Sequence, residues 1–432
     1  MKAWILLFIS FFVSQFIYAQ DRSACFGGEA KFIPSNGEKL LIIGQDLGAV
    51  GGLSSYTDGY IDAFDYYPSG VTTYTNIVNL QGLSSKTNYG AGDVNAQKYL
   101  DESKFSNTTI AIGLYLVGEE RNVINGNRDY NIRKLAKWIK NSNRPVYLRI
   151  GYEFDGPHNN YNPSNYIKMY QHIVDVFDEE RVLNCDFVWQ SDGVHTVNTL
   201  NSYYPGDEYV DWMAFSYFAQ GAGNSLINFA KDKGKPVMIA EATPMGFDLE
   251  ATREDVWSKW FTPLFDLIDK NEEIKALAYI NVDWNAQPMW KDSGINWGDS
   301  RIQANTSVFN NWKTETDDGT WLKSSSELFT TIGYPFTADE GCFATVTSLE
   351  QDLASQITVY SNNSNLKIEL KDNISIHQLT IIELGSGKVI EEVKLDKKST
   401  SLELPLRSGL YSLVMYNDLG EQIIKKVYHT TK

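Results

Sequence analysis

Eight apolar, β-rich runs recur between residues 39 and 283, and most are followed by turn residues and a helical pattern. Several runs are apolar at successive positions, as expected for parallel strands that are buried on both faces. Eight such units predict a closed α/β structure, the (β/α)8 or TIM barrel. The predicted strands are Lys39–Gly44, Gly70–Tyr74, Thr108–Leu116, Val146–Glu153, Asp186–Gln190, Asp211–Tyr217, Pro236–Glu241 and Lys275–Asp283.

The segments between these runs carry caps and periodicity typical of helices. Asn162 precedes Pro163, and apolar residues then recur at helical spacing, which predicts a helix that begins at Pro163. Thr252 and Asp255 resemble a capping box at the start of another helix. We expect the apolar stripes of these helices to pack against the barrel.

The composition changes near Ala338. Residues 357–432 hold strictly alternating runs, such as the one from Leu366 to Leu370, separated by short turns. This pattern predicts a small antiparallel, β-sandwich-like C-terminal domain. We therefore expect a barrel domain over residues 20–337, a linker over 338–356 and a β-rich domain over 357–432.

The first nineteen residues have the layout of a secretory signal peptide. Lys2 supplies the positive end, an apolar run extends from Ala3 to Phe16, and Ala19 is a small residue at the expected cleavage point. We expect a protein that is secreted or attached to the cell surface. Cys25 lies too far from the apolar run to favour a lipid anchor. No later stretch reaches the ~20 apolar residues of a membrane helix, so we expect no membrane span.

The net charge of −16, from 38 basic and 54 acidic residues, disfavours polyanions as partners. Nucleic acids and anionic membranes bind mainly through Lys and Arg, so we expect neither, and a highly sulfated polysaccharide needs a locally basic cleft. The 11 Trp and 25 Tyr residues are ordinary core and surface aromatics or flat platforms for sugar rings. We expect a monomer.

The three cysteines, Cys25, Cys185 and Cys342, form no CxxC pair and no cluster with the five histidines. The sequence therefore indicates no metal site, and nothing in it indicates a cofactor. Cys25 and Cys342 flank the barrel domain, so one interpretation is a disulfide that ties its two ends together. Cys185 would then be a buried thiol.

Two predicted strands end on a glutamate, Glu153 on the fourth and Glu241 on the seventh. The reacting groups of α/β barrels lie at the carboxyl ends of the strands, so we expect both carboxylates on one rim. Side chains alternate along a strand, which places Arg149 inside the barrel beneath Glu153. A buried arginine needs an anionic partner, and a position near Glu241 would keep that carboxylate ionised at neutral pH.

Hydrolysis of a glycosidic bond needs one protonated carboxyl that donates to the leaving oxygen. It also needs one ionised carboxylate that attacks the anomeric carbon or activates water. Glu153 and Glu241 can supply this pair. The alternative is that each glutamate forms a surface ion pair, but two of them on the fourth and seventh strands favour catalysis.

Residues 149–156 (RIGYEFDG), 204–212 (YPGDEYVDW) and 235–241 (KPVMIAE) resemble segments of glycoside hydrolase family 26, in the same order. That family contains secreted β-mannanases, β-1,3-xylanases and some β-glucanases, and the resemblance covers roughly residues 39–335. It implies that Glu153 is the general acid/base and Glu241 the nucleophile, and that Tyr217 hydrogen-bonds the nucleophile. The family is retaining, which implies carboxyl groups ~5 Å apart and a covalent intermediate.

Tyr152 departs from the family pattern, because the mannanases have His before the acid/base Glu and the wider clan has Asn. Residues 44–47 (GQDL), 68–75 (PSGVTTYT) and 112–115 (IGLY) are more similar to the β-1,3-xylanase branch. We therefore expect an endo-β-glycanase that cuts an algal hemicellulose, with β-1,3-xylan favoured and β-mannan or another algal glycan as alternatives. A non-catalytic glycan-binding protein is the second alternative, although both carboxylates are present.

Further candidates are aromatic or polar residues at or near the strand ends. Trp189 and Trp284 each serve either as a platform on which a sugar stacks or as part of the core. The other candidates can hydrogen-bond sugar hydroxyls or support loop structure. They are Asp46, Tyr115, Tyr152 and Asp155.

Parts of the tail, including residues 357–362 (ITVYSN), 387–389 (GKV) and 408–411 (SGLY), resemble the C-terminal sorting domain of the type IX secretion system. The usual Tyr-Pro-Asn-Pro of that domain is Tyr360-Ser361-Asn362-Asn363 here. The resemblance implies that the type IX machinery binds the tail and removes it at the outer membrane. A small carbohydrate-binding module is the alternative.

Overall fold

The computed structural model describes residues 29–218, 223–251, 255–291, 293–336, 357–362, 365–370, 376–383, 388–394, 401–417 and 422–429. The predicted signal peptide and the predicted Cys25–Cys342 disulfide lie outside these residues. The chain divides into two compact units, Met1–Thr337 and Ala338–Lys432, which are described separately. Among the described residues, no helix has the length and apolar character needed to cross a membrane.

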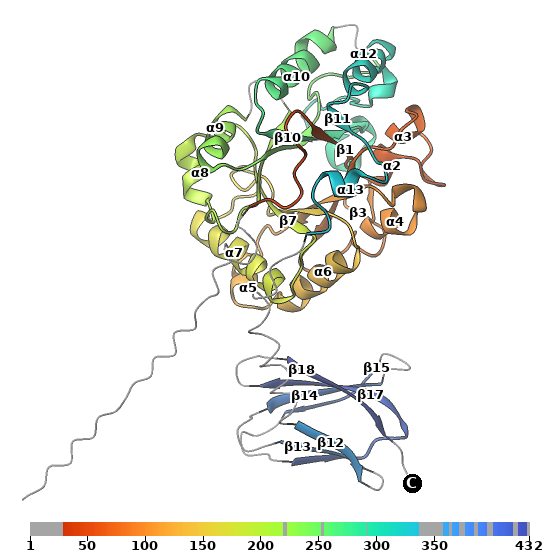
Figure 1. Ribbon diagram of the computed structural model, residues 1–432, viewed down its shortest axis with the longest axis vertical. Coiled ribbons are helices and arrows are strands. Elements are labelled where there is room, and N and C mark those ends of the chain that lie inside the picture. The colour runs from red at the N-terminus through yellow and green to blue at the C-terminus, as the bar shows by residue number, and fades with distance from the viewer. Residues whose placement is uncertain are drawn as a thin grey trace, which may run out of the picture. The chain divides into compact units, whose positions relative to one another are not determined.

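Eight parallel strands close into a barrel in the first unit, which confirms the predicted (β/α)8 fold (Figure 1). Each strand pairs with the next along the chain, and β10 returns to β1, where Leu41 lies opposite Leu277. A short strand, β11 (Trp321–Leu322), also pairs with the start of β1. The barrel strands are β1 (Lys39–Gly44), β2 (Gly70–Asn76), β5 (Thr109–Tyr115), β6 (Val146–Ile150), β7 (Cys185–Ser191), β8 (Trp212–Tyr217), β9 (Val237–Ala242) and β10 (Ile274–Ile280).

Helices surround the barrel (Figure 1). The longest, α7 (Pro163–Glu179), begins where the sequence predicts, because the side chain of Asn162 accepts a hydrogen bond from the backbone N–H of Asn165. Of the predicted capping box, Thr252 lies outside the described residues. The remaining elements are α2 (Leu47–Val50), α3 (Tyr60–Ala63), β3 (Thr87–Asn88), β4 (Asp93–Val94), α4 (Ala96–Asp101), η1 (Ser103–Phe105), α5 (Glu120–Ile124), α6 (Asp129–Asn141), α8 (Val197–Tyr203), α9 (Asn224–Lys233), η2 (Trp257–Phe261), α10 (Thr262–Asp269), η3 (Trp284–Ala286), α11 (Pro288–Lys291), η4 (Ile302–Ala304), α12 (Thr306–Thr316) and α13 (Leu328–Thr331).

Inside the barrel, apolar side chains form a layer near the amino ends of the strands. This layer includes Tyr147, Val188 and Ala214, and Phe32 from the segment before β1 packs against it. Two residues further along the same strands, the next inward-facing side chains are polar. The apolar layer therefore supports a polar layer at the carboxyl ends of the strands.

The C-terminal unit consists of antiparallel sheets, as predicted. One sheet has the strand order β12-β13-β16 and the other β15-β14-β17-β18. Leu366, Ile381 and Leu413 are buried together in its core. Its strands are β12 (Ile357–Asn362), β13 (Asn365–Leu370), β14 (Ile376–Glu383), β15 (Lys388–Lys394), β16 (Ser401–Leu404), β17 (Gly409–Asn417) and β18 (Gln422–His429).

Candidate active site

Arg149 lies in the polar layer of the barrel and is fully buried. Alternation along β6 predicts this position, because Arg149 lies two residues after the inward-facing Tyr147. Its Nη1 donates to Glu241 Oε1 at 2.5 Å and to Gln190 Oε1 at 2.9 Å, and its Nη2 donates to Thr72 Oγ1 at 3.2 Å. A buried guanidinium is tolerated only with such partners, so Arg149 orders side chains from three other strands.

Glu241 points into the barrel because β9 has a bulge at this position. Its neighbour Ala240 already belongs to the inner layer, so regular alternation would turn Glu241 outward. The pairing with β8 skips Ala240, since Phe215 lies opposite Ile239 and Ser216 lies opposite Glu241. A bulge of this kind re-aims a side chain, and here it directs two consecutive residues inward.

The Glu241 side chain is held in a largely buried position, with 7% of the residue exposed. Burial raises the pKa of Glu241 above its ordinary value; Arg149 opposes this rise, the charge of Glu153 adds to it, and a hydrogen bond from Tyr74 opposes it. Tyr74 Oη donates to Glu241 Oε1 at 2.9 Å. Arg149 therefore favours the ionised carboxylate, but it does not cancel the effect of burial. Both of these hydrogen bonds reach Oε1, and among the described residues none donates to Oε2.

Glu153 lies beyond the end of its strand, which corrects the strand predicted to end on it. β6 ends at Ile150, and Gly151 and Glu153 then adopt φ angles of 56° and 50°. This left-handed conformation costs a residue with a Cβ roughly 1 kcal/mol, so other contacts must hold it. Asn159 supplies them, because its Nδ2 donates to the carbonyl oxygens of Tyr152 at 3.0 Å and Glu153 at 2.9 Å.

The carboxyl group of Glu153 has one side-chain partner at each oxygen. Ser216 Oγ donates to Oε1 at 2.6 Å, and Nε2 of His158 lies 2.9 Å from Oε2. Ser216 in turn accepts from Gln190 Nε2 at 3.1 Å, so a path of hydrogen bonds joins Arg149 to Glu153. The His158 side chain is 58% exposed, and its hydrogen bond with Glu153 raises the pKa of His158 above its ordinary value.

Two tyrosines flank the guanidinium group of Arg149. The rings of Tyr74 and Tyr152 meet edge to face with their centroids 5.5 Å apart. The guanidinium carbon lies 4.9 Å from the centroid of Tyr74 and 5.3 Å from that of Tyr152. Burial raises the pKa of both hydroxyl groups, so both stay neutral donors. Tyr152 also lines the cleft described next, which places it within reach of a substrate.

A cleft of about 1110 Å³ is lined by both glutamates. Its lining residues with a carboxyl or imidazole group are Glu153, His158, Asp192, His195 and Glu241. No Lys or Arg of the described ranges lines it. Several large apolar side chains around it are exposed, namely Val78, Tyr89, Tyr115, Val194, Met289 and Ile295. This lining fits an uncharged ligand with apolar faces.

Trp189, a candidate for either the rim or the core, and Tyr217, whose implied role required the rim, both face the helices. Their neighbours on β7 and β8 take the inward positions. Trp189 is fully buried and stacks on Phe154 with centroids 4.3 Å apart, so it is no platform for a sugar. Tyr217 is buried with its ring edge-on to Trp260. The hydrogen bond to Glu241 that the resemblance implied for Tyr217 comes from Tyr74.

Asp46 and Asp155 are buried and do not line the cleft, which favours the second of the two interpretations, support of loop structure. Asp46 accepts from two backbone N–H groups and so caps α2. Asp155 accepts from Ser191 Oγ at 2.6 Å and from the backbone N–H of Asp192 at 2.8 Å. Burial raises the pKa of Asp46 and of Asp155 to about 6.

Asp155, Asp192 and His195 bring three potential metal ligands within 4.8 Å of one another. Both oxygens of Asp155 already accept hydrogen bonds from the protein. Those bonds satisfy the Asp155 carboxyl without an ion. The cluster therefore does not by itself indicate a metal centre.

Trp284 and Tyr115 do line the cleft. The indole Nε1 of Trp284 donates to Thr243 Oγ1 at 3.0 Å, which fixes the ring. Trp297 packs on the same indole with centroids 5.0 Å apart, and Trp290 meets it edge to face at 5.5 Å. These indoles form an aromatic wall that a sugar ring can contact.

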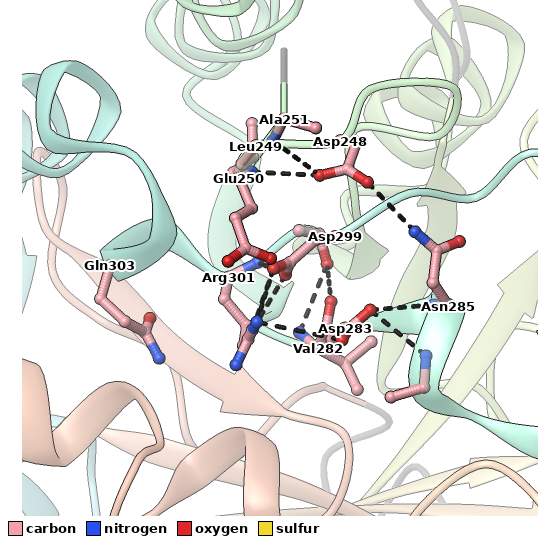
Figure 2. A network of polar contacts seen from close by, with 12 residues as sticks. Asp248, Leu249, Glu250, Ala251, Val282, Asp283, Asn285, Asp299, Arg301 and Gln303 are labelled. Carbon is pink, nitrogen blue, oxygen red and sulfur yellow. Dashed lines mark hydrogen bonds and ion pairs between the residues drawn. The ribbon is translucent and has the colours of Figure 1, made fainter.

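Figure 2 shows the polar network that anchors the segment carrying Trp284. Asp283 caps η3, accepting from the backbone N–H of Asn285 at 3.0 Å. Asn285 Nδ2 donates to Asp248, in the segment after β9, at 3.1 Å. Arg301 lies 3.9 Å from Asp283 and adds an ion pair. These contacts connect the aromatic wall to the segment that carries Asp248 and to the segment that carries Arg301.

Five residues around the two glutamates were not predicted from the sequence: Tyr74, His158, Asn159, Gln190 and Ser216. Two of them carried a usable signal, because Gln190 and Ser216 continue the inward side of their predicted strands. The other three were not singled out. His158 and Asn159 lie in a loop without periodicity, and Tyr74 ends its predicted strand without belonging to a pattern that indicated a role.

A barrel with two glutamates on one cleft has the architecture of a glycosidase. The model of the family described as "Glycosyl hydrolase family 26" matches residues 56–247. "Beta-1,3-xylanase TXYA" of Vibrio sp is 32% identical over 334 residues, covering 71% of this chain and 70% of the relative. "Beta-1,3-xylanase" of Alcaligenes sp is 32% identical over 344 residues, covering 72% and 70%. The chain therefore belongs to glycosyl hydrolase family 26.

Solved structures share the fold at lower identity. A modular endo-β-1,4-mannanase from Cellulomonas fimi superposes with a TM-score of 0.50 at 12% identity, covering 92% of this chain and 95% of its own. A family 26 β-mannanase from Bacteroides ovatus also gives 0.50 at 14% identity, covering 72% and 95%. These likenesses support the barrel and carry no information on the substrate.

Proposed function

We propose that this protein is a secreted, retaining endo-β-glycanase that cuts β-1,3-xylan, with Glu153 as general acid/base and Glu241 as nucleophile. The observation that carries the proposal is the different setting of two carboxyl groups on one cleft. Arg149 and Tyr74 stabilise a charge on Glu241. Glu153 instead contacts a hydroxyl and an imidazole, which suit a group that gains and loses a proton.

In the first step, Glu153 gives its proton to the glycosidic oxygen while Glu241 attacks the anomeric carbon and the carbon–oxygen bond breaks. In the second step, the Glu153 carboxylate takes a proton from water. The water oxygen bonds to the anomeric carbon, and the bond to Glu241 breaks. Two inversions retain the β-configuration, which requires the two carboxyl groups to be ~5 Å apart.

The substrate is a neutral glycan in this proposal. A sulfated polysaccharide would bring anions into a cleft whose described lining holds carboxylates and no Lys or Arg. Two relatives at 32% identity bear the name β-1,3-xylanase. Tyr152 stands where the mannanases of the family have His, which further favours xylan over mannan.

Release of reducing ends from a panel of polysaccharides tests the assignment. We expect products from β-1,3-xylan and little or none from β-mannan, β-1,4-xylan and a sulfated algal glycan. A ladder of oligosaccharides indicates endo action, and a single short product would contradict it. Binding to a glycan with no release of reducing ends from any substrate would favour a non-catalytic glycan-binding protein.

We also propose export through the signal peptide at residues 1–19, with residues 357–432 as a type IX sorting domain. The separate antiparallel unit at residues 357–429 is compatible with this role. The mass of the protein recovered outside the cell gives the test: we expect the tail to be absent, and light scattering to report a monomer. A retained tail that binds insoluble glycan would favour the carbohydrate-binding alternative.

A further inference from the structure

We propose that Glu153 carries its catalytic proton on Oε2 and shares it with His158, so that the two residues act as a single acid. The proposal rests on the proposed function, in which Glu153 is the general acid/base. It adds which oxygen holds the proton and which second residue sets the pH range of the reaction.

The hydrogen bonds from Arg149 to Glu153 run in one direction. A guanidinium has donors and no acceptor, so the Gln190 atom that lies 2.9 Å from Arg149 Nη1 is the amide oxygen. The amide nitrogen is then the group that donates to Ser216 Oγ at 3.1 Å. The orientation of Gln190 is thus fixed by the charge on Arg149.

Ser216 accepts from Gln190 and therefore donates its own proton to Glu153. Its hydroxyl is buried and carries one proton, and among the described residues Glu153 Oε1, at 2.6 Å, is the acceptor within reach. A proton on Oε1 would leave the hydroxyl proton of Ser216 buried without an acceptor, which is costly. Oε1 is therefore an acceptor, and the acidic proton belongs on Oε2.

His158 Nε2 lies 2.9 Å from this second oxygen. One proton between the two atoms satisfies both, either as Oε2–H donating to Nε2 or as Nε2–H donating to Oε2. The exposed imidazole can withdraw when a glycosidic oxygen takes its place. Gly156 makes room for the ring, because a Cβ at that position would lie 2.6 Å from His158 Cε1.

The hydrogen bond with Glu153 raises the pKa of His158 most; burial opposes this rise, and the charges of Glu153, Asp192 and Glu241 add to it. The net effect favours the protonated imidazole, so the proton shared with Oε2 stays on His158 to a higher pH than on an isolated imidazole. During the first step the proton leaves Oε2 for the glycosidic oxygen as Glu241 bonds to the anomeric carbon. During the second step, water returns a proton to Oε2 as its oxygen replaces Glu241.

The test is the pH profile of kcat/KM for His158→Asn on a β-1,3-xylo-oligosaccharide. We expect the basic limb to move to lower pH by about one unit or more, because the imidazole that shares the proton with Oε2 is then missing. Gly156→Ala, which displaces the ring, should move the limb in the same direction. His172→Asn is the matched control, because His172 pairs with Asp129 at 2.7 Å outside the cleft, and its profile should stay unchanged.

A glycoside with a strongly acidic phenol as leaving group separates this role from a structural one. Its first step needs no proton donor, so His158→Asn should keep the wild-type rate of phenol release while losing activity on the oligosaccharide at basic pH. An unchanged basic limb in both variants would overturn the proposal. Full hydrolysis by Glu153→Ala would instead overturn the proposed function, so the two failures are distinguishable.

Discussion

Glu241 and Glu153 are the same residue type, yet the protein builds their surroundings from different parts. Glu241 lies on a strand, is aimed by a bulge, and contacts a guanidinium and a phenol. Glu153 lies in a turn after its strand, on a left-handed backbone, and contacts a hydroxyl and an exposed imidazole. The partners of Glu241 favour its ionised form against the effect of burial, and the surroundings of Glu153 suit a mobile proton. The neighbours, not the carboxyl groups, separate the two roles.

Removing either glutamate should have the largest effect on activity. We expect Glu241→Ala and Glu153→Ala to lower kcat/KM on β-1,3-xylan by about 10⁴-fold or more. Azide then separates the roles. It should rescue Glu241→Ala on an activated glycoside by attacking the face that the nucleophile occupied, which gives an α-glycosyl azide, whereas Glu153→Ala should give the β-azide.

The configuration of each azide can be measured by NMR spectroscopy. Identical configurations from both variants would contradict the assignment of roles. Circular dichroism spectra that match the wild type provide the control for folding.

Arg149→Met tests whether the charge on Glu241 depends on its partner. We expect kcat/KM to fall by about 10²-fold or more. The free energy of unfolding should fall by about 3–5 kcal/mol at neutral pH, because a buried carboxylate then lacks a counter-charge. Adding Glu241→Gln should recover much of this loss in a denaturant titration. A double variant no more stable than Arg149→Met would show that packing, not charge, accounts for the loss.

The acidic limb of the pH profile reports on Glu241. Because burial raises the pKa of Glu241, kcat/KM should fall with decreasing pH above the range of an ordinary glutamate. Tyr74→Phe removes a hydrogen bond to the ionised form, so the limb should move up by about one pH unit, equivalent to ~1.4 kcal/mol. Tyr217→Phe, on the helix side, should leave the limb in place. The opposite result would restore the role that the resemblance implied for Tyr217.

Asn159→Ala tests the turn that carries Glu153. Losing two hydrogen bonds to backbone carbonyls should reduce the free energy of unfolding by about 1–3 kcal/mol, measured by denaturant titration. We expect kcat to fall several-fold with a smaller change in KM, because the proton donor is displaced while the rest of the cleft persists. An unchanged kcat would show that the left-handed turn keeps its conformation without the hydrogen bonds from Asn159.

The barrel could be predicted because strands buried on both faces leave continuous apolar runs in the sequence. Alternation also placed Arg149 correctly. The same rule could not place Glu241, because β9 breaks it at the bulge, nor Glu153, because β6 ends at Ile150. At the ends of strands, either of two neighbours can face inward, and this ambiguity is why the sequence left Trp189 as a candidate for both the cleft and the core.

The bulge in β9 makes this strand sensitive to its length. Deleting Ala240 would restore regular alternation and leave Glu241 pointing inward, with every other side chain of the site intact. The carboxyl group would then sit one residue lower, by roughly 3.3 Å, at the level of the apolar layer and below Tyr74. The extra residue serves as a spacer that raises the carboxylate from the apolar layer of the barrel to the polar layer.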